Sequence, residues 1–286
     1  MKILFQKTNT LKMLYRFILL GLLLSFGYTV NAQSDYNLKG SPQNKLGIVY
    51  DSEFSASFNL HTNGYSFSID KGQIKTYYKT RYYHFEIGEI RHPKEYKHRQ
   101  TISSAGASQL RSFNFGKQNN LYAIRAGIGQ KRYYTEKASH NGLAIGINYE
   151  FGFTLGVLKP YYLRMENIEG DDVVEKFSEN NASTFLNIDK IAGSAGMFTG
   201  FSESKVVPGG HFKIGLHFDW GAFDEFLKAM EIGIMGDVFI KKMPIMVDDA
   251  YVVLNNNKTI DILSANVANR PFFLNVYLSL QLGKRK

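Results

Sequence analysis

The clearest pattern in the chain is an alternation of apolar and polar side chains over Phe272 to Leu282. Every even position is apolar, whereas the odd positions include Asn275, Ser279 and Gln281. A β-strand sends successive side chains to opposite faces. This segment therefore predicts a strand with one wholly apolar face and one mostly polar face.

The same alternation recurs along the chain and predicts about eight long strands in all. Asn63-Gly64 marks a tight hairpin after the first strand, because both residues tolerate positive φ, and a further turn is expected at Lys71-Gly72. The fifth strand is expected to be continuous, although a turn near Gly152 would split it, and ten strands are the alternative. The strands predicted before the closing one are 46–60, 65–70, 82–87, 122–131, 143–157, 211–220 and 231–241.

The N-terminus has the parts of a secretory signal peptide. Four basic residues in the first 16 precede the apolar run 17–30, and Val30-Asn31-Ala32 supplies a small-residue cleavage site. The apolar run is shorter than the roughly 20 residues that a membrane-spanning helix needs. We expect a cleaved signal over 1–32, a polar lead-in over 33–45 and a barrel over 46–286, with an uncleaved anchor as the alternative.

Long alternating strands behind an export signal favour a closed antiparallel transmembrane β-barrel, apolar towards lipid and polar towards its own interior. No later segment is apolar and long enough for a helical span, so strands must make any crossing. The 22 Phe and 18 Tyr residues fit the aromatic girdles of such barrels. The alternative is a soluble, secreted β-sandwich.

The predicted connections favour the barrel over the sandwich. They are short after strands two, four and six and long after strands three, five and seven. Outer-membrane barrels have short periplasmic turns and long extracellular loops, and a sandwich has no reason to show this asymmetry. The sequence therefore predicts that the protein is located in the outer membrane of a Gram-negative bacterium.

Charge and cysteine content exclude several classes of function. The formal charge is +9, and the signal peptide carries four of these charges, which leaves a scattered +5 that does not indicate nucleic-acid binding. The chain has no Cys, which excludes disulfides, thiolate metal sites and lipid attachment at an N-terminal Cys. No metal and no cofactor are expected.

The inward face of the predicted strands carries many charged and His side chains. A barrel of about eight strands is just wide enough for side chains to fill it, so these groups are expected to pair into a polar plug. The alternative is a narrow polar passage, or a proton-accessible site around His84 and His217. The predicted interior network is Asp51, Glu53, His84, Glu86, Arg125, Lys131, Glu150, Lys213, His217, Asp219, Glu231 and Asp237.

No catalytic residue is predicted, because the lipid-facing positions are almost purely apolar. Every His on a strand (His61, His84, His211 and His217) has inward parity. A lipid- or lipopolysaccharide-modifying enzyme would therefore depend on loop residues such as His92, His98 and His140.

The connection 91–119 is basic, with Glu95 as its only acidic residue. Lipopolysaccharide phosphates are the anions available outside a Gram-negative cell, so we expect ionic contact between them and this connection; an ordinary solvated loop is the alternative. The residues proposed for this contact are Arg91, Lys94, Lys97 and Arg99. The longest connection, 158–210, contains short apolar pieces that suggest partial order.

Three segments, 91–95 (RHPKE), 115–120 (FGKQNN) and 157–163 (VLKPYYL), resemble a family of uncharacterised outer-membrane β-barrel proteins of Bacteroidota. The resemblance implies a barrel over most of the mature chain and brings no activity. The chain departs from the usual terminal Phe of such barrels by ending in Gly283-Lys284-Arg285-Lys286. We expect a non-enzymatic barrel that presents its loops to a partner, or an accessory component of an envelope machine; an enzyme and a narrow pore are the alternatives.

Overall fold

The computed structural model describes residues 50–76, 78–104, 107–135, 143–166, 172–220, 225–247 and 269–286. The predicted signal peptide and lead-in lie outside the described residues. Gly47 to Lys286 form one compact unit.

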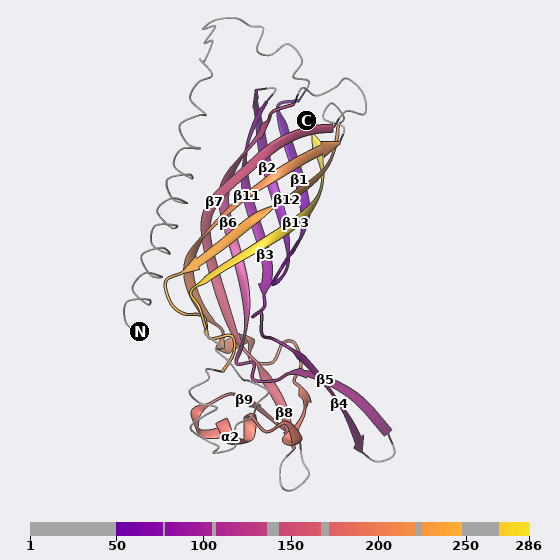
Figure 1. The fold of residues 1–286 in the computed structure, drawn as a ribbon, viewed down its shortest axis with the longest axis vertical. Coiled ribbons are helices and arrows are strands. Elements are labelled where there is room, and N and C mark those ends of the chain that lie inside the picture. The colour runs from indigo at the N-terminus through magenta and orange to yellow at the C-terminus, as the bar shows by residue number, and fades with distance from the viewer. Residues whose placement is uncertain are drawn as a thin grey trace, which may run out of the picture. The chain divides into compact units, whose positions relative to one another are not determined.

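Eight long antiparallel strands close into a barrel in the order β1-β13-β12-β11-β7-β6-β3-β2. Figure 1 shows the first and last of these strands side by side in the closed wall. Closure confirms the eight-stranded prediction, and ten strands is wrong. The barrel strands are β1 (Ser52–His61), β2 (Gly64–Thr76), β3 (Lys79–Ile90), β6 (Asn119–Tyr133), β7 (Leu143–Pro160), β11 (Lys205–Trp220), β12 (Phe226–Phe239) and β13 (Phe272–Arg285).

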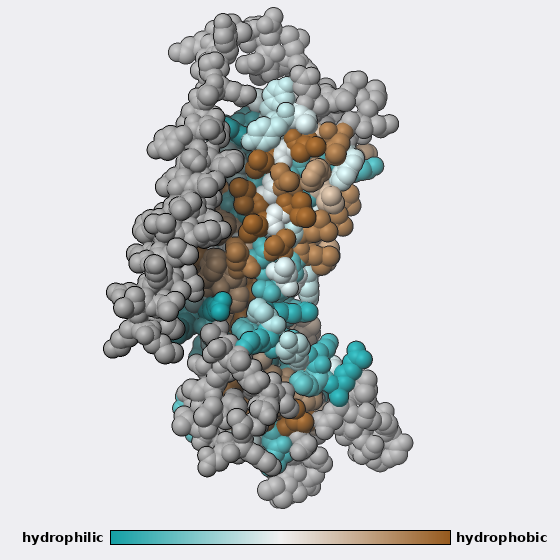
Figure 2. All heavy atoms as spheres, in the orientation of Figure 1, coloured by the Kyte–Doolittle hydropathy of each residue, from teal (hydrophilic) through white to brown (hydrophobic). Residues whose placement is uncertain are grey.

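The wall of the barrel has the polarity predicted from the alternation. Outward apolar side chains are exposed, for example Phe67 (61%), Phe153 (80%) and Leu280 (53%), and Figure 2 shows hydrophobic side chains gathered on the visible wall. Inward side chains are buried and mostly polar. A soluble sandwich buries its apolar face, so the opposite arrangement excludes that alternative and is that of a membrane-crossing barrel. No helix in the described part is long and apolar enough to span a membrane.

Several strand boundaries differ from the predicted ones. β7 is one strand, without a turn at Gly152. The turn predicted at Lys71-Gly72 is wrong, since β2 continues to Thr76. Gly72 makes room for an inward neighbour instead, because a Cβ there would lie 2.7 Å from Cγ of Glu53.

The last strand and β11 are longer than predicted. β13 includes Gly283-Lys284-Arg285, which the prediction left as a tail. β11 begins at Lys205, because Pro208-Gly209-Gly210 pairs with β7 although it breaks the alternation. Lys241, the last residue of the predicted strand 231–241, is exposed beyond the end of β12.

The two ends of the barrel are unequal, as predicted. The short-turn end carries the connections β2–β3, β6–β7 and β11–β12. Residues 50 and 286 lie at the same end, where the backbone N–H of Lys286 donates a hydrogen bond to Ser52 O. The loop end carries the tight β1–β2 hairpin and the three long connections.

The long connections are more ordered than the sequence predicted. The connection after β3 forms a two-stranded hairpin, and the one after β7 forms a three-stranded sheet in the order β10-β8-β9. These elements, called the head below, are β4 (Lys97–Ser104), β5 (Ala107–Asn114), β8 (Tyr162–Glu166), β9 (Asp172–Lys176), η3 (Glu179–Asn181), α2 (Ala182–Phe185), η4 (Ile188–Lys190), β10 (Ile191–Ser194) and η5 (Phe201–Glu203).

Candidate functional site: the barrel interior and the head

Arg125 on β6 forms the centre of an ionic cluster that crosses the barrel interior. Its Nε and Nη2 each donate to the carboxylate of Asp237 on β12 at 2.8 Å, and its Nη1 donates to Glu86 on β3. All three side chains are fully buried. A bidentate pair of this kind fixes the planar guanidinium geometrically, so Arg125 links strands that are not neighbours in the wall.

Glu86 extends this cluster to further strands. Its Oε2 accepts hydrogen bonds from Lys213 Nζ on β11 at 2.9 Å and from Asn59 Nδ2 on β1 at 3.2 Å, and it lies 3.2 Å from Nε2 of His84. One carboxylate therefore contacts side chains from three other strands, β1, β6 and β11, and His84 on its own strand.

His84 and His211 share one carboxylate. Glu150 Oε1 on β7 lies 3.3 Å from Nε2 of His84 and 3.0 Å from Nε2 of His211. The Nδ1 of His84 contacts Asp70. The two rings lie 6.3 Å apart between centroids.

The two histidines of the alternative proton-accessible site, His84 and His217, contact different carboxylates. His217 contacts Glu231, with Nδ1 3.2 Å from Oε2. Glu231 also accepts hydrogen bonds from Asn148 Nδ2 at 2.9 Å and 3.0 Å and from the Tyr277 hydroxyl. The pattern of inward positions could not reveal this, because it places residues on a face without showing which strands face each other across the lumen.

A second ionic group closes the short-turn end. Lys131 Nζ donates to Glu53 at 2.9 Å, and Arg285 donates to Asp219, which also accepts from the Tyr133 hydroxyl at 3.1 Å. The sequence interpretation missed Arg285 because it treated the basic C-terminus as a tail. Arg285 has an odd residue number, as do the inward positions of β13. This parity could have identified it as an interior residue.

All of the predicted interior residues are buried except Asp51. Asp51 is exposed and precedes β1, because the strand begins at Ser52 and not at residue 46 as the alternation suggested. Inside the barrel the buried charges comprise seven carboxylates and four Lys or Arg side chains, and His84, His211 and His217 each contact a carboxylate. The carboxylates are Glu53, Asp70, Glu86, Glu150, Asp219, Glu231 and Asp237, and the cations are Arg125, Lys131, Lys213 and Arg285.

The interior leaves almost no space around these groups. A cavity lined by Asp70, His84, Glu150 and Lys213 has a volume of about 10 Å³. That is about the volume one water molecule requires.

An apolar cap closes the loop end above the ionic cluster. Met243, Ile245 and Met246, from the connection after β12, pack in one buried cluster with side chains that end the barrel strands. The backbone N–H groups of Gln118 and Asn119 both donate to Ile245 O. The strand residues of the cap cluster are Ile90, Leu121, Ala123, Leu158, Phe239 and Phe273.

The head has an apolar core of its own. Side chains from β5, β8, α2 and β10 form a second buried cluster, which Val247 joins from the end of the cap segment. Tyr161 packs against this cluster, and burial raises the pKa of its hydroxyl. The core residues are Phe113, Phe115, Leu163, Met165, Phe185, Leu186, Ile191 and Val247.

Three large apolar side chains of the head face solvent. Met197, Phe198 and Phe201, which we call the apolar knob, are 72%, 84% and 64% exposed. The turn that carries them requires Gly200, whose φ of 78° lies in the left-handed region and where a Cβ would lie 2.3 Å from Cε2 of Tyr162.

A polar contact holds the turn of the apolar knob against β8 and β9. Glu203 accepts hydrogen bonds from Lys176 Nζ and, at 2.9 Å, from the Tyr162 hydroxyl. The bond from Lys176, and then that from Tyr162, hold the pKa of Glu203 below its usual range. The knob is therefore part of a defined turn.

The basic connection is only partly available to an external anion. Lys97 and Arg99 are exposed on one face of β4, and Lys94 is half-buried in the preceding turn. Arg91 donates to Glu89 at 3.0 Å. Of the loop histidines, His98 stacks on Phe113 at 5.9 Å, and His140 lies outside the described residues.

The described residues contain no group of three or more His, Asp or Glu side chains arranged to hold a metal ion. The interior groups bind one another through hydrogen bonds and ion pairs.

Comparisons with known proteins add little to this description. No family model matches the chain, and no curated protein matches it, so the resemblance to a Bacteroidota family stays a prediction. Among solved structures, the crystal structure of neisserial surface protein A (NspA) matches with a TM-score of 0.36 and 7% sequence identity, over 82% of this chain and 96% of that chain. This likeness is too distant to carry an argument, and the fold rests on the strand pairing itself.

Proposed function

We propose that this protein is a non-enzymatic barrel of the outer membrane of a Gram-negative bacterium that presents its head to a partner outside the cell. It serves there as a surface protein or as an accessory component of an envelope machine. The observation that carries the proposal is the double closure of the lumen, by the Arg125 ionic cluster and by the apolar cap. A closed barrel transports nothing, which leaves the head as the part that can act.

The composition of the head supports binding to a protein. The apolar knob exposes one Met and two Phe side chains, residue types enriched at the centres of protein interfaces. The exposed Lys97 and Arg99 on β4 offer a separate contact for lipopolysaccharide phosphates.

The test is affinity purification from gently solubilised outer membrane. A Phe198→Ser/Phe201→Ser variant keeps the buried head core and removes most of the apolar surface of the knob. We expect proteins that co-purify with the wild type to be lost from this variant. Tyr134→Ser is the matched control, since Tyr134 is 67% exposed at the short-turn end, and it should retain them. If all three forms recover the same proteins, the knob is not the partner site.

A further inference from the structure

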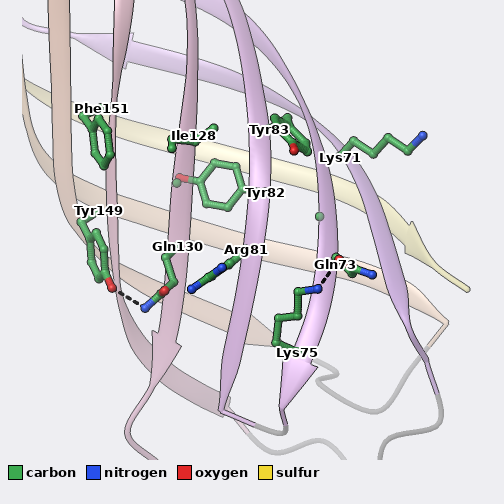
Figure 3. Close-up of a pocket in the computed structure, with 12 residues that line it drawn as sticks. Lys71, Gln73, Lys75, Arg81, Tyr82, Tyr83, Ile128, Gln130, Tyr149 and Phe151 are labelled. Carbon is green, nitrogen blue, oxygen red and sulfur yellow. Dashed lines mark hydrogen bonds between the residues drawn. The ribbon is translucent and has the colours of Figure 1, made fainter.

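A groove of about 700 Å³ opens in the outer wall of the barrel, over β2, β3, β6 and β7 (Figure 3). Most of its lining side chains form two rows that follow the strand register and lie near the short-turn end. The first row is Lys71, Tyr83, Ile128 and Phe151, and the second is Gln73, Arg81, Gln130 and Tyr149.

The first row continues the lipid-facing surface. Tyr83 is 73% exposed and Phe151 60% exposed, with Ile128 between them. The next row towards the middle of the barrel is wholly apolar: Ile69, Phe85, Ala126 and Phe153. An acyl chain that follows the wall meets only apolar side chains in this row.

The second row is polar and basic. Gln130 donates a hydrogen bond to the Tyr149 hydroxyl, and Lys75 donates one to Gln73 (Figure 3). Lys71, Lys75 and Arg81 line the groove without any carboxylate. In the described part of the chain, these three cations form no ion pair with the protein's own carboxylates.

The floor of the groove depends on a missing side chain. A Cβ at Gly129 would lie 2.2 Å from Cζ of Tyr82, so the glycine lets this ring lie beneath the wall. The Tyr82 hydroxyl is fixed by hydrogen bonds to Asn148 at 2.8 Å and Glu150 at 3.0 Å. The groove is therefore supported by the packed interior.

We propose that this groove binds one anionic glycerophospholipid. Its acyl chains lie over Tyr83, Ile128 and Phe151, and its phosphate contacts Lys71 and Arg81. Cationic side chains near a membrane surface attract anionic lipids, and Lys71 and Arg81 lie in the two rows of the groove beside the outward side chains of Tyr83, Ile128 and Phe151, an arrangement that matches a headgroup joined to its chains. The inference rests on the membrane location proposed above, which assigns the short-turn end to the periplasmic leaflet.

Native mass spectrometry of the detergent-solubilised full chain tests this site, with phosphatidylglycerol and phosphatidylcholine of identical acyl chains as probes. We expect the first phosphatidylglycerol to bind roughly tenfold more tightly than phosphatidylcholine. Lys71→Gln/Arg81→Gln should bring the two affinities together. The control Lys228→Gln/Lys284→Gln removes two outward cations at the same end, on β12 and β13, and should keep the preference.

Equal binding of the two lipids by the wild type would overturn the proposal, as would equal losses in the two double variants. If Lys71→Gln/Arg81→Gln does not fold, Ile128→Trp decides the question, because it fills the groove with an outward side chain and keeps the cations. It should lose the tightly bound phosphatidylglycerol, and retention would place that lipid elsewhere. Flotation with liposomes reports membrane insertion separately, so a failure of the groove is distinguishable from a failure of the proposed location.

Discussion

Arg125 is a fully buried charge inside the barrel. A charge removed from water costs several kcal/mol unless it is paired with good geometry. Arg125 meets this condition through Asp237 and Glu86, which are as fully buried as it is. The same argument makes its removal costly, because two carboxylates would lose their main partner.

Arg125→Ala should lower the free energy of unfolding by roughly 3–5 kcal/mol, the cost of breaking a buried ion pair from one side. Urea titration in lipid vesicles measures this. Arg132→Ala is the control, since Arg132 lies on the same strand with an exposed side chain, and it should change stability by about 0.5 kcal/mol or less. Equal effects of the two substitutions would contradict the ionic cluster.

Gly215 shows that the face on which a residue lies does not by itself predict the effect of a substitution. Its inward position alone would make Gly215→Ser mild. A Cβ there, however, would lie 2.6 Å from the Tyr277 hydroxyl oxygen and 2.9 Å from Ile232 O. We expect Gly215→Ser to destabilise the barrel by about 1–3 kcal/mol through overpacking, in the same titration, and an unchanged midpoint would show that Tyr277 moves freely.

At the scale of the strand, one face meets lipid and the other meets the packed interior. Leu278 on β13 illustrates the outward face, with Leu60 and Ile232 as its partners on the two adjacent strands. All three are apolar and exposed. The alternation in the sequence therefore corresponds to two different environments, lipid on one face of the strand and the packed polar interior on the other.

Leu278→Arg should cost roughly 2–4 kcal/mol if the side chain lies near the bilayer midplane. Leu278→Phe, which stays apolar on the same face, should fold as the wild type does. Both are measured by the heat-dependent mobility shift of the folded barrel and by urea titration. Normal assembly of the Arg variant would show that even positions of β13 do not face lipid.

The head elements are separable from the barrel wall. β7 ends at Pro160 and β11 begins at Lys205, so replacing residues 166–204 with a short Gly/Ser linker leaves every barrel strand intact. We expect the shortened protein to insert and stay heat-modifiable while it loses its co-purifying partner. Failure to insert would mean that the head is needed to build the barrel.

For the whole molecule, the two closures of the lumen act in series. The cap at the loop end is apolar, and the cluster beneath it is ionic. Because the cavity between Asp70, His84, Glu150 and Lys213 has a volume of only about 10 Å³, we expect that opening either closure alone does not create a continuous path.

The wild type should therefore carry no steady current in planar bilayers. Glu86→Gln, which weakens the ionic cluster, should reduce stability and leave the current near zero, because the cap remains. A large, stable conductance of the wild type would overturn the closed barrel and favour a pore.

The sequence by itself determined the class of fold. Alternation over segments such as 143–157 and 272–282 depends only on the two-residue repeat of a strand, so it predicted eight strands, their faces and the unequal ends. It also identified most of the buried charges, because inward position follows from residue number alone.

Only the tertiary structure decided which of those residues meet. Whether His84 joins His211 or His217, and whether Arg285 belongs to the interior, depends on barrel closure and on strand stagger, which bring distant strands face to face. The cap, the head core and the lipid groove have the same origin. Each combines residues from several strands or loops whose register no local repeat encodes, and Gly129 and Gly215 acquire their roles from side chains far away in the chain.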